Sequence, residues 1–222
     1  MPGAAAIWYY PRDLVWQDSL LRAISNEWMV AVAVKSSAEA MIQAERCFAV
    51  GCATRVGSTI SIFFEALGNQ KAAFAAIQGF ESSWDELNGD PENERLRREL
   101  PNEITKLLRR AEESESPYGR AVYHAISATG ALVREWKSDD PEYAPVIGAA
   151  IAVAMEFDKL GIDAPGGHGS WLSFELNGEA ALAAQIFKDP GLIGPGEMFV
   201  IQTAAGSGSM PYREALIRLS RP

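Results

Sequence analysis

Helix start and stop signals recur between residues 36 and 161, and they constrain the fold more than any other feature of the sequence. Asp90-Pro91 and Ser116-Pro117 each place a capping residue directly before a proline, the arrangement that opens many helices. Lys159-Leu160-Gly161-Ile162 has the glycine and the following apolar residue of a Schellman-type stop. We therefore predict a mostly helical middle region, whose best-defined helix begins near Ala144 and ends at this stop.

Other segments of the middle region leave alternatives open. The alanine-rich residues 70–78 predict a helix, whereas residues 58–67 alternate like a strand but end like a helix. Pro101 interrupts the next helical pattern, which predicts two helices or a kink at that point. Between Val122 and Trp136, apolar residues recur at alternating steps of four and three, so we expect a helix with one apolar face.

Apolar runs of strand length lie on both sides of this helical middle. Two lie near the N-terminus, and three lie after Ile162, where glycine and proline become frequent. The five runs are Ile7–Tyr10, Trp28–Val34, Trp171–Leu176, Met198–Thr203 and Arg213–Leu219. We expect an α+β fold in one domain over residues 1–222, with the helical region packed beside a small sheet of N- and C-terminal strands. A separate β-rich subdomain over residues 162–222 is the alternative.

The charge of the chain limits its partners. The sequence has 222 residues, of which 48% are hydrophobic and 22% charged, and its formal net charge is −9. Nucleic acids and anionic membranes both attract basic surfaces, so we expect neither as a partner. Much of the charge falls in a band of mixed sign, residues 81–115, which is typical of a solvated helical face.

The expected location of the protein is the cytoplasm of a cell, whether the chain is cellular or viral in origin. The N-terminus lacks the basic stretch followed by a long apolar run that marks a secretory signal. The longest apolar stretch, Val146–Met155, is about half of the ~20 residues that a membrane span needs. Two cysteines, Cys47 and Cys52, do not form a disulfide framework, and we interpret them as small core residues.

No cofactor or metal site is expected from the sequence. A structural zinc site needs about four Cys or His ligands, and this chain has only two residues of each type, far apart. The nucleophile motif G-x-S-x-G of hydrolases is missing as well. The weak catalytic candidate is His168, because its side chain titrates near neutral pH and the surrounding glycines would let a ligand approach the backbone.

Aromatic residues near the N-terminus are the most suggestive functional feature. Trp8, Tyr9, Tyr10 and Trp16 fall within nine positions, and residues of these types are frequent where proteins bind each other. We therefore expect a non-catalytic, self-associating structural or interaction subunit, with a protein partner or further copies of itself. The alternatives are an enzyme or ligand-binding protein with a pocket near the 165–170 loop, and an acidic inhibitor or immunity-like protein of a basic partner.

Overall fold

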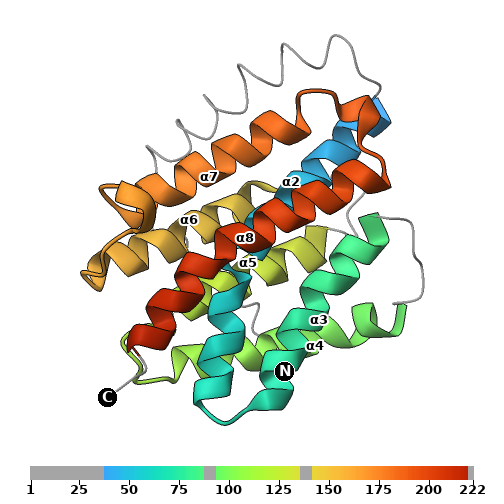
Figure 1. Ribbon diagram of the computed structural model, residues 1–222. Coiled ribbons are helices and arrows are strands. Elements are labelled where there is room, and N and C mark those ends of the chain that lie inside the picture. Colours follow the sequence, from blue (N-terminus) through green and yellow to red (C-terminus); the bar gives the residue numbers. More distant parts are fainter. Residues whose placement is uncertain (1–37, 88–93, 136–141, 220–222) are drawn as a thin grey trace.

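The computed structural model describes residues 38–87, 94–135 and 142–219, and within these ranges it contains helices but no β-strand (Figure 1). The expected α+β fold with a small sheet is therefore wrong for the described part of the chain. The two N-terminal runs that we predicted as strands lie outside it. The α-helices are α2 (Ala38–Ala66), α3 (Gln70–Leu87), α4 (Glu94–Glu112), α5 (Gly119–Glu135), α6 (Ala144–Lys159), α7 (Trp171–Ile186) and α8 (Pro195–Leu219). Two 3₁₀ turns, η2 (Pro165–Gly167) and η3 (Pro190–Leu192), precede α7 and α8.

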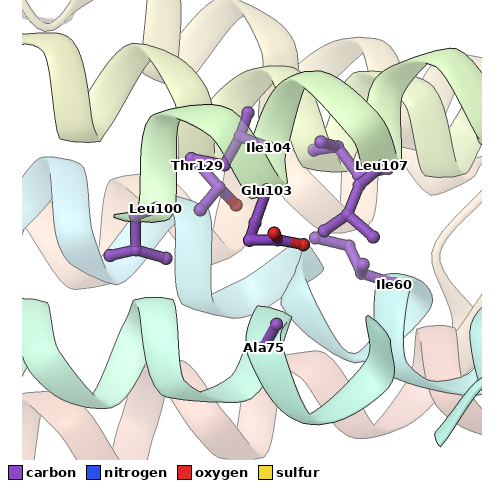
Figure 2. Close-up of a pocket in the computed structure, with 8 residues that line it drawn as sticks. Ile60, Ala75, Leu100, Glu103, Ile104, Leu107 and Thr129 are labelled. Carbon is purple, nitrogen blue, oxygen red and sulfur yellow. The ribbon is translucent and has the colours of Figure 1, made fainter. Parts of the chain in front are cut away.

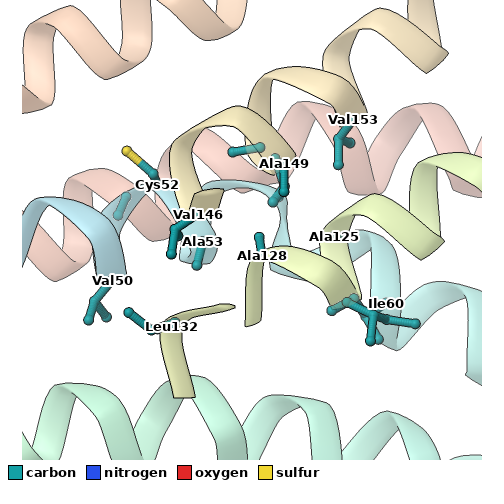
Figure 3. Packing of buried hydrophobic residues seen from close by; sticks show 14 of the residues in the cluster. Val50, Cys52, Ala53, Ile60, Ala125, Ala128, Leu132, Val146, Ala149 and Val153 are labelled. Carbon is teal, nitrogen blue, oxygen red and sulfur yellow. The ribbon is translucent and has the colours of Figure 1, made fainter. Parts of the chain in front are cut away.

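Helix α2 lies at the centre of the bundle. It contacts α3, α5, α6, α7 and α8, and Figure 3 shows part of the apolar core that it shares with α5 and α6. Because neighbours pack on several sides, buried residues occur around the helix instead of on a single stripe. The ambiguous segment 58–67 belongs to this helix, where Ile60, Ile62 and Phe64 are all buried. Burial on several sides explains why their spacing resembled that of a strand.

Helix α2 is also, within the described ranges, the one helix long and apolar enough to cross a membrane. In its most apolar 18-residue window, 78% of the residues are buried inside the bundle. Core helices of soluble proteins pass the same test of length and composition, so this finding is weak evidence for a membrane span. The Val146–Met155 stretch that we noted in the sequence lies in α6, and it packs mainly against α5 and α7.

The predictions for α5 and α6 are confirmed. Val122, Ile126 and Thr129 lie on the buried face of α5, as the alternating steps of four and three predicted. Helix α6 begins at Ala144, and Gly161 follows its end with a φ of 67°, a left-handed conformation that favours glycine. Pro101 lies inside the single helix α4, so of the two predicted alternatives, two helices or a kink, that of two separate helices is wrong.

The C-terminal region corrects the predicted strands. Trp171–Leu176 begins α7, while Met198–Thr203 and Arg213–Leu219 both belong to α8. No strand occurs in described residues 162–219, so a β-rich subdomain there is also wrong. The short apolar runs looked like strands because the glycines between them resembled loop residues. Tertiary packing overrides such local preferences when a helix can bury one face.

The start of α7 is fixed by its neighbours in the bundle. The Ser170 hydroxyl accepts a hydrogen bond from the backbone N–H of Ser173 (3.0 Å), as N-cap residues do. The Asp158 carboxylate at the end of α6 accepts two more, from the N–H groups of Trp171 (2.7 Å) and Leu172 (3.0 Å). Three N–H groups that the helix itself cannot satisfy are thus paired. These contacts position the start of α7, where the buried residues Trp171 and Glu175 lie.

Candidate functional site

A buried polar cluster joins α2, α7 and α8. The Arg55 guanidinium donates two hydrogen bonds to Glu175, from Nε to Oε1 at 2.9 Å and from Nη2 to Oε2 at 3.1 Å. The Tyr212 hydroxyl donates a third bond to Oε2 of the same carboxylate at 2.9 Å. The side chains of Arg55 and Glu175 are only 7% and 0% exposed, so this ion pair is shielded from water. Bidentate geometry of this kind is the arrangement in which a buried pair can offset its desolvation.

Glycines on two helices make room for this guanidinium. A Cβ atom added at Gly178 of α7 or at Gly208 of α8 would overlap the Arg55 side chain. Both residues lie in helix interiors, where glycine is unfavourable by about 0.5–1 kcal/mol relative to alanine. The Phe174 ring covers another side of the guanidinium, with its centroid 5.4 Å from Cζ. The cluster is therefore enclosed by protein atoms rather than open to a ligand.

A second glutamate lies one turn from Glu175 on α7. Glu179 is buried, and its Oε1 atom has no hydrogen-bond partner. Burial and then the charge of Glu175 raise the pKa of Glu179 well above its usual range, although Arg55 acts in the opposite direction. We conclude that Glu175 is the charge partner of Arg55, and that burial favours the neutral form of Glu179.

The buried thiols and the buried phenol are held in their unreactive forms. Burial raises the pKa of Cys47 to about 12, and burial together with Glu179 and Glu175 raises the pKa of Cys52 well above its usual value. Burial and then Glu175 raise the pKa of Tyr212 likewise. A nucleophilic cysteine needs a lowered pKa and access to solvent, whereas these two thiols are fully buried. Their placement agrees with the interpretation of both cysteines as core residues.

A small recess lies between α2, α3, α4 and α5 (Figure 2). It has room for about one water molecule. Its lining is apolar apart from Glu103 and Thr129, and the hydroxyl of Thr129 is already bonded to the Ala125 carbonyl. Such a recess is too small for a substrate and can hold at most about one water molecule.

The outward surface of α8 is the most unusual surface among the described residues. We call it the outer face of α8; its exposed residues are Gly196, Phe199, Val200, Thr203, Ala204, Ser207, Met210 and Glu214. Phe199 is 69% exposed, Val200 53% and Met210 44%. The chain has no charged residue from Met198 to Tyr212, a run of fifteen positions. In the view of Figure 1, α8 crosses the near side of the bundle.

Such a face differs from an ordinary solvated helix surface. Surface helices normally carry charged residues opposite their buried stripe, as α4 does with Lys106, Arg109 and Arg110. The buried stripe of α8 contains Met198, Ile201, Ala205 and Tyr212, which pack toward α2 and α7. A helical segment such as Met198–Tyr212, which is uncharged on both sides, is typical of a segment with neighbours on both sides.

A smaller exposed apolar group lies where α2 meets α3. Leu67, Phe74 and Ile77 are 57%, 59% and 40% exposed. The exposed polar residues Gln70 and Lys71 lie between Leu67 and Phe74 in the sequence. This group is shorter than the outer face of α8 and is interrupted by charge, so it is the weaker candidate for an interface.

Of the residues predicted as functional from the sequence, His168 alone lies in the described part of the chain. Trp8, Tyr9, Tyr10 and Trp16 lie outside the described residues. His168 follows η2 at the surface, where its ring packs edge-on against Phe174 with centroids 5.4 Å apart. Asn177 Nδ2 lies 3.4 Å from His168 Nδ1.

No protein-family model, curated protein or solved structure matches this chain in the comparisons with known proteins. Its function is therefore inferred from its own residues. Sequence reasoning missed both the Arg55–Glu175 pair and the outer face of α8. The signals that could have indicated them are the isolated glycines Gly178 and Gly208, and the fifteen consecutive uncharged positions.

Proposed function

We propose that this protein is a non-catalytic, self-associating subunit of a larger protein assembly, and that the outer face of α8 contacts a neighbouring subunit. The observation that carries the proposal is this face, with Phe199, Val200 and Met210 exposed along a run of fifteen uncharged residues. Protein interfaces are depleted of charge at their centres and enriched in aromatic residues and methionine. Large apolar side chains exposed along one continuous strip are typical of interaction surfaces.

The buried polar cluster supports a structural role. Arg55 and Tyr212 both donate hydrogen bonds to Glu175, which links three helices. Gly178 and Gly208 bring the backbone of α7 and α8 against the guanidinium. A satisfied buried network can fix one relative placement of the helices that it joins. Because α8 is one of these helices, the cluster would hold the outer face of α8 in a rigid position. Preorganised surfaces lose less conformational entropy when they bind.

Assembly beyond a pair of subunits would need a second surface. The N-terminal residues Trp8, Tyr9, Tyr10 and Trp16 remain our predicted second contact, because their residue types favour interfaces. A chain with two different interaction surfaces can join more than two subunits, whereas a single symmetric surface closes as a dimer. We therefore assign pairing to the outer face of α8 and further assembly to the aromatic N-terminus.

The test is the molar mass of the full chain in solution, measured by size-exclusion chromatography with light scattering over a hundredfold range of concentration. We expect the mass of a dimer or larger species at high concentration. Phe199→Lys should lower this mass because it places a charge at the proposed contact. Phe74→Lys is a matched control, since it changes the same residue type at a similarly exposed position on α3. A wild-type chain that stays monomeric throughout would contradict the proposal.

A further inference from the structure

The exposed residues of α8 follow the spacing of a helix that pairs with another helix. Gly196, Val200, Thr203, Ser207, Met210 and Glu214 are all exposed, at alternating steps of four and three. This is the spacing of the contacting positions in two-helix coiled coils. We propose that α8 packs antiparallel against α8 of a second copy of this chain, about a two-fold axis level with Ala205. The inference rests on the proposed self-association and specifies its surface and geometry.

A second copy is the occupant that fits an uncharged surface on an acidic chain. In a two-fold interface the same patch contacts itself, so any charge near the axis faces a like charge. The chain carries a net charge of −9, so an acidic face would repel its own copy. The outer face of α8 avoids this repulsion, because no charged residue lies between Met198 and Tyr212. A basic partner would instead favour an acidic face.

The charges at the two ends of α8 favour the antiparallel orientation. Glu197 lies near the N-terminal end, whereas Arg213, Glu214 and Arg218 lie near the C-terminal end, and all four are exposed. Glu214 pairs with Arg218 at 3.7 Å, so Arg213 gives the C-terminal end its net positive charge. Antiparallel pairing brings each acidic end beside the basic end of the other copy. Parallel pairing would instead bring like ends together. Arg213 has no ion-pair partner within the described ranges, so its charge is available to a neighbour.

The register follows from the same spacing. With the axis level with Ala205, Val200 lies opposite Met210 of the partner subunit, and Thr203 lies opposite the partner's Ser207. Phe199 then lies on the same flank as the partner's Met210 and the partner's Arg213. Sulfur–aromatic and cation–π contacts are both favourable for an exposed phenylalanine ring.

Small side chains at the middle of the face support close packing there. Thr203, Ala204 and Ser207 surround the axis, and the distance between packed helices shrinks as the side chains at their crossing become smaller. From Gly196 to Glu214 the face extends for about 27 Å, given a rise of about 1.5 Å per residue. The larger residues Val200 and Met210 lie toward the two ends of this strip, where they meet each other across the axis.

Cysteine cross-linking tests the orientation directly. Val200→Cys and Met210→Cys are prepared singly in the full chain and treated with a short bismaleimide, and the native Cys47 and Cys52 are buried and do not compete. In the antiparallel pair each variant alone places its two thiols about 15 Å apart along the helix axes. Coexpression of the two variants under different tags should instead give an efficient link between unlike chains. Efficient links in each single variant, and none between unlike chains, would show parallel pairing and overturn the inference.

Charge reversal provides an independent test. Arg213→Glu should weaken dimerisation about tenfold, because it removes two symmetric contacts with Phe199 and brings acidic residues to both ends of the pair. Arg120→Glu is the matched control, an exposed arginine on α5 instead of α8, and it should leave the dissociation constant unchanged. A wild-type monomer at every concentration would overturn both the proposed function and this inference. A dimer that shows no link between the unlike chains on coexpression would overturn this inference alone.

Discussion

The two buried glutamates of α7 should respond very differently to the same substitution. Glu175 accepts three hydrogen bonds, two of them from the buried Arg55 guanidinium. Glu175→Gln leaves that guanidinium without its charge partner, and removal of one partner from a buried pair costs about 3–5 kcal/mol. Burial favours the neutral form of Glu179, which a glutamine resembles, so we expect Glu179→Gln to change the free energy of unfolding at pH 5 by no more than about 1 kcal/mol.

The pH dependence makes this contrast sharper. The pKa of Glu179 is raised in the folded protein, whereas in the unfolded chain it lies near the ordinary value of about 4.3. Below that pH, Glu179 is protonated in both the folded and the unfolded state, and its contribution to the free energy of unfolding is fully present. As the pH rises, the unfolded state ionises first, so the free energy of unfolding falls by up to about 1.4 kcal/mol per pH unit until the folded pKa is reached. Glu179→Gln removes this slope.

The assay is urea unfolding of the wild type, both single variants and the double variant at pH 5, 6, 7 and 8, at one protein concentration. Glu179→Gln should gain stability over the wild type as the pH rises. In the Glu175→Gln variant, Glu179 can ionise and replace the lost charge. We therefore expect the free energy of unfolding to fall by about 3 kcal/mol, the lower end of the range for a broken buried pair. The double variant should lose more free energy of unfolding than the two single variants together, because no carboxylate then remains to pair with Arg55. Equal losses for the two single variants, or the same pH profile for Glu179→Gln and the wild type, would refute this assignment of charge.

Three further predictions concern the buried residues and the helix ends. Gly208→Ala should lower the free energy of unfolding by at least about 2 kcal/mol, because the added Cβ would overlap Arg55. At Gly206 an added Cβ meets open space, so Gly206→Ala should stabilise the chain by about 0.5–1 kcal/mol. Thermal unfolding distinguishes the two variants. Asp158→Ala should cost about 1 kcal/mol in urea unfolding, because two N–H groups at the start of α7 lose their acceptor, and no change at all would contradict that capping role. Native protein at pH 8 should not react with a thiol reagent within minutes, because Cys47 and Cys52 are buried and their raised pKa values favour the thiol form. Urea-unfolded protein should react at both cysteines. Rapid labelling of the folded protein would contradict the described core.

The sequence predicted those helices whose outward side is polar. In α5 a single buried stripe with polar residues around it produces a clear 3.6-residue period, and Gly161 marks the end of α6 through a left-handed conformation. In α2 that period is lost, because helices pack on several sides of it. In α8 it is lost for a different reason, since the outer face is uncharged as well. Short apolar runs separated by Gly206 and Gly208 then resemble strands and loops.

The polar cluster could not be predicted from local patterns. Arg55 and Glu175 are 120 positions apart, and only the packing of α7 against α2 brings them together. The one local trace of this packing is a glycine in the middle of a helix at Gly178 and again at Gly208. Isolated glycines of this kind can indicate close approach of another group, but they do not identify that group. The outer face of α8 became recognisable only after residues 195–219 proved to be one helix.

Native mass spectrometry of the full, unmodified chain tests the central claim most directly, because it counts the subunits of each species. We expect a dimer at low micromolar concentration, and species with more subunits as the concentration rises. The same spectrum of Phe199→Lys should shift toward monomer, while that of Phe74→Lys should match the wild type. A wild-type spectrum that contains only monomer at every concentration would contradict the account.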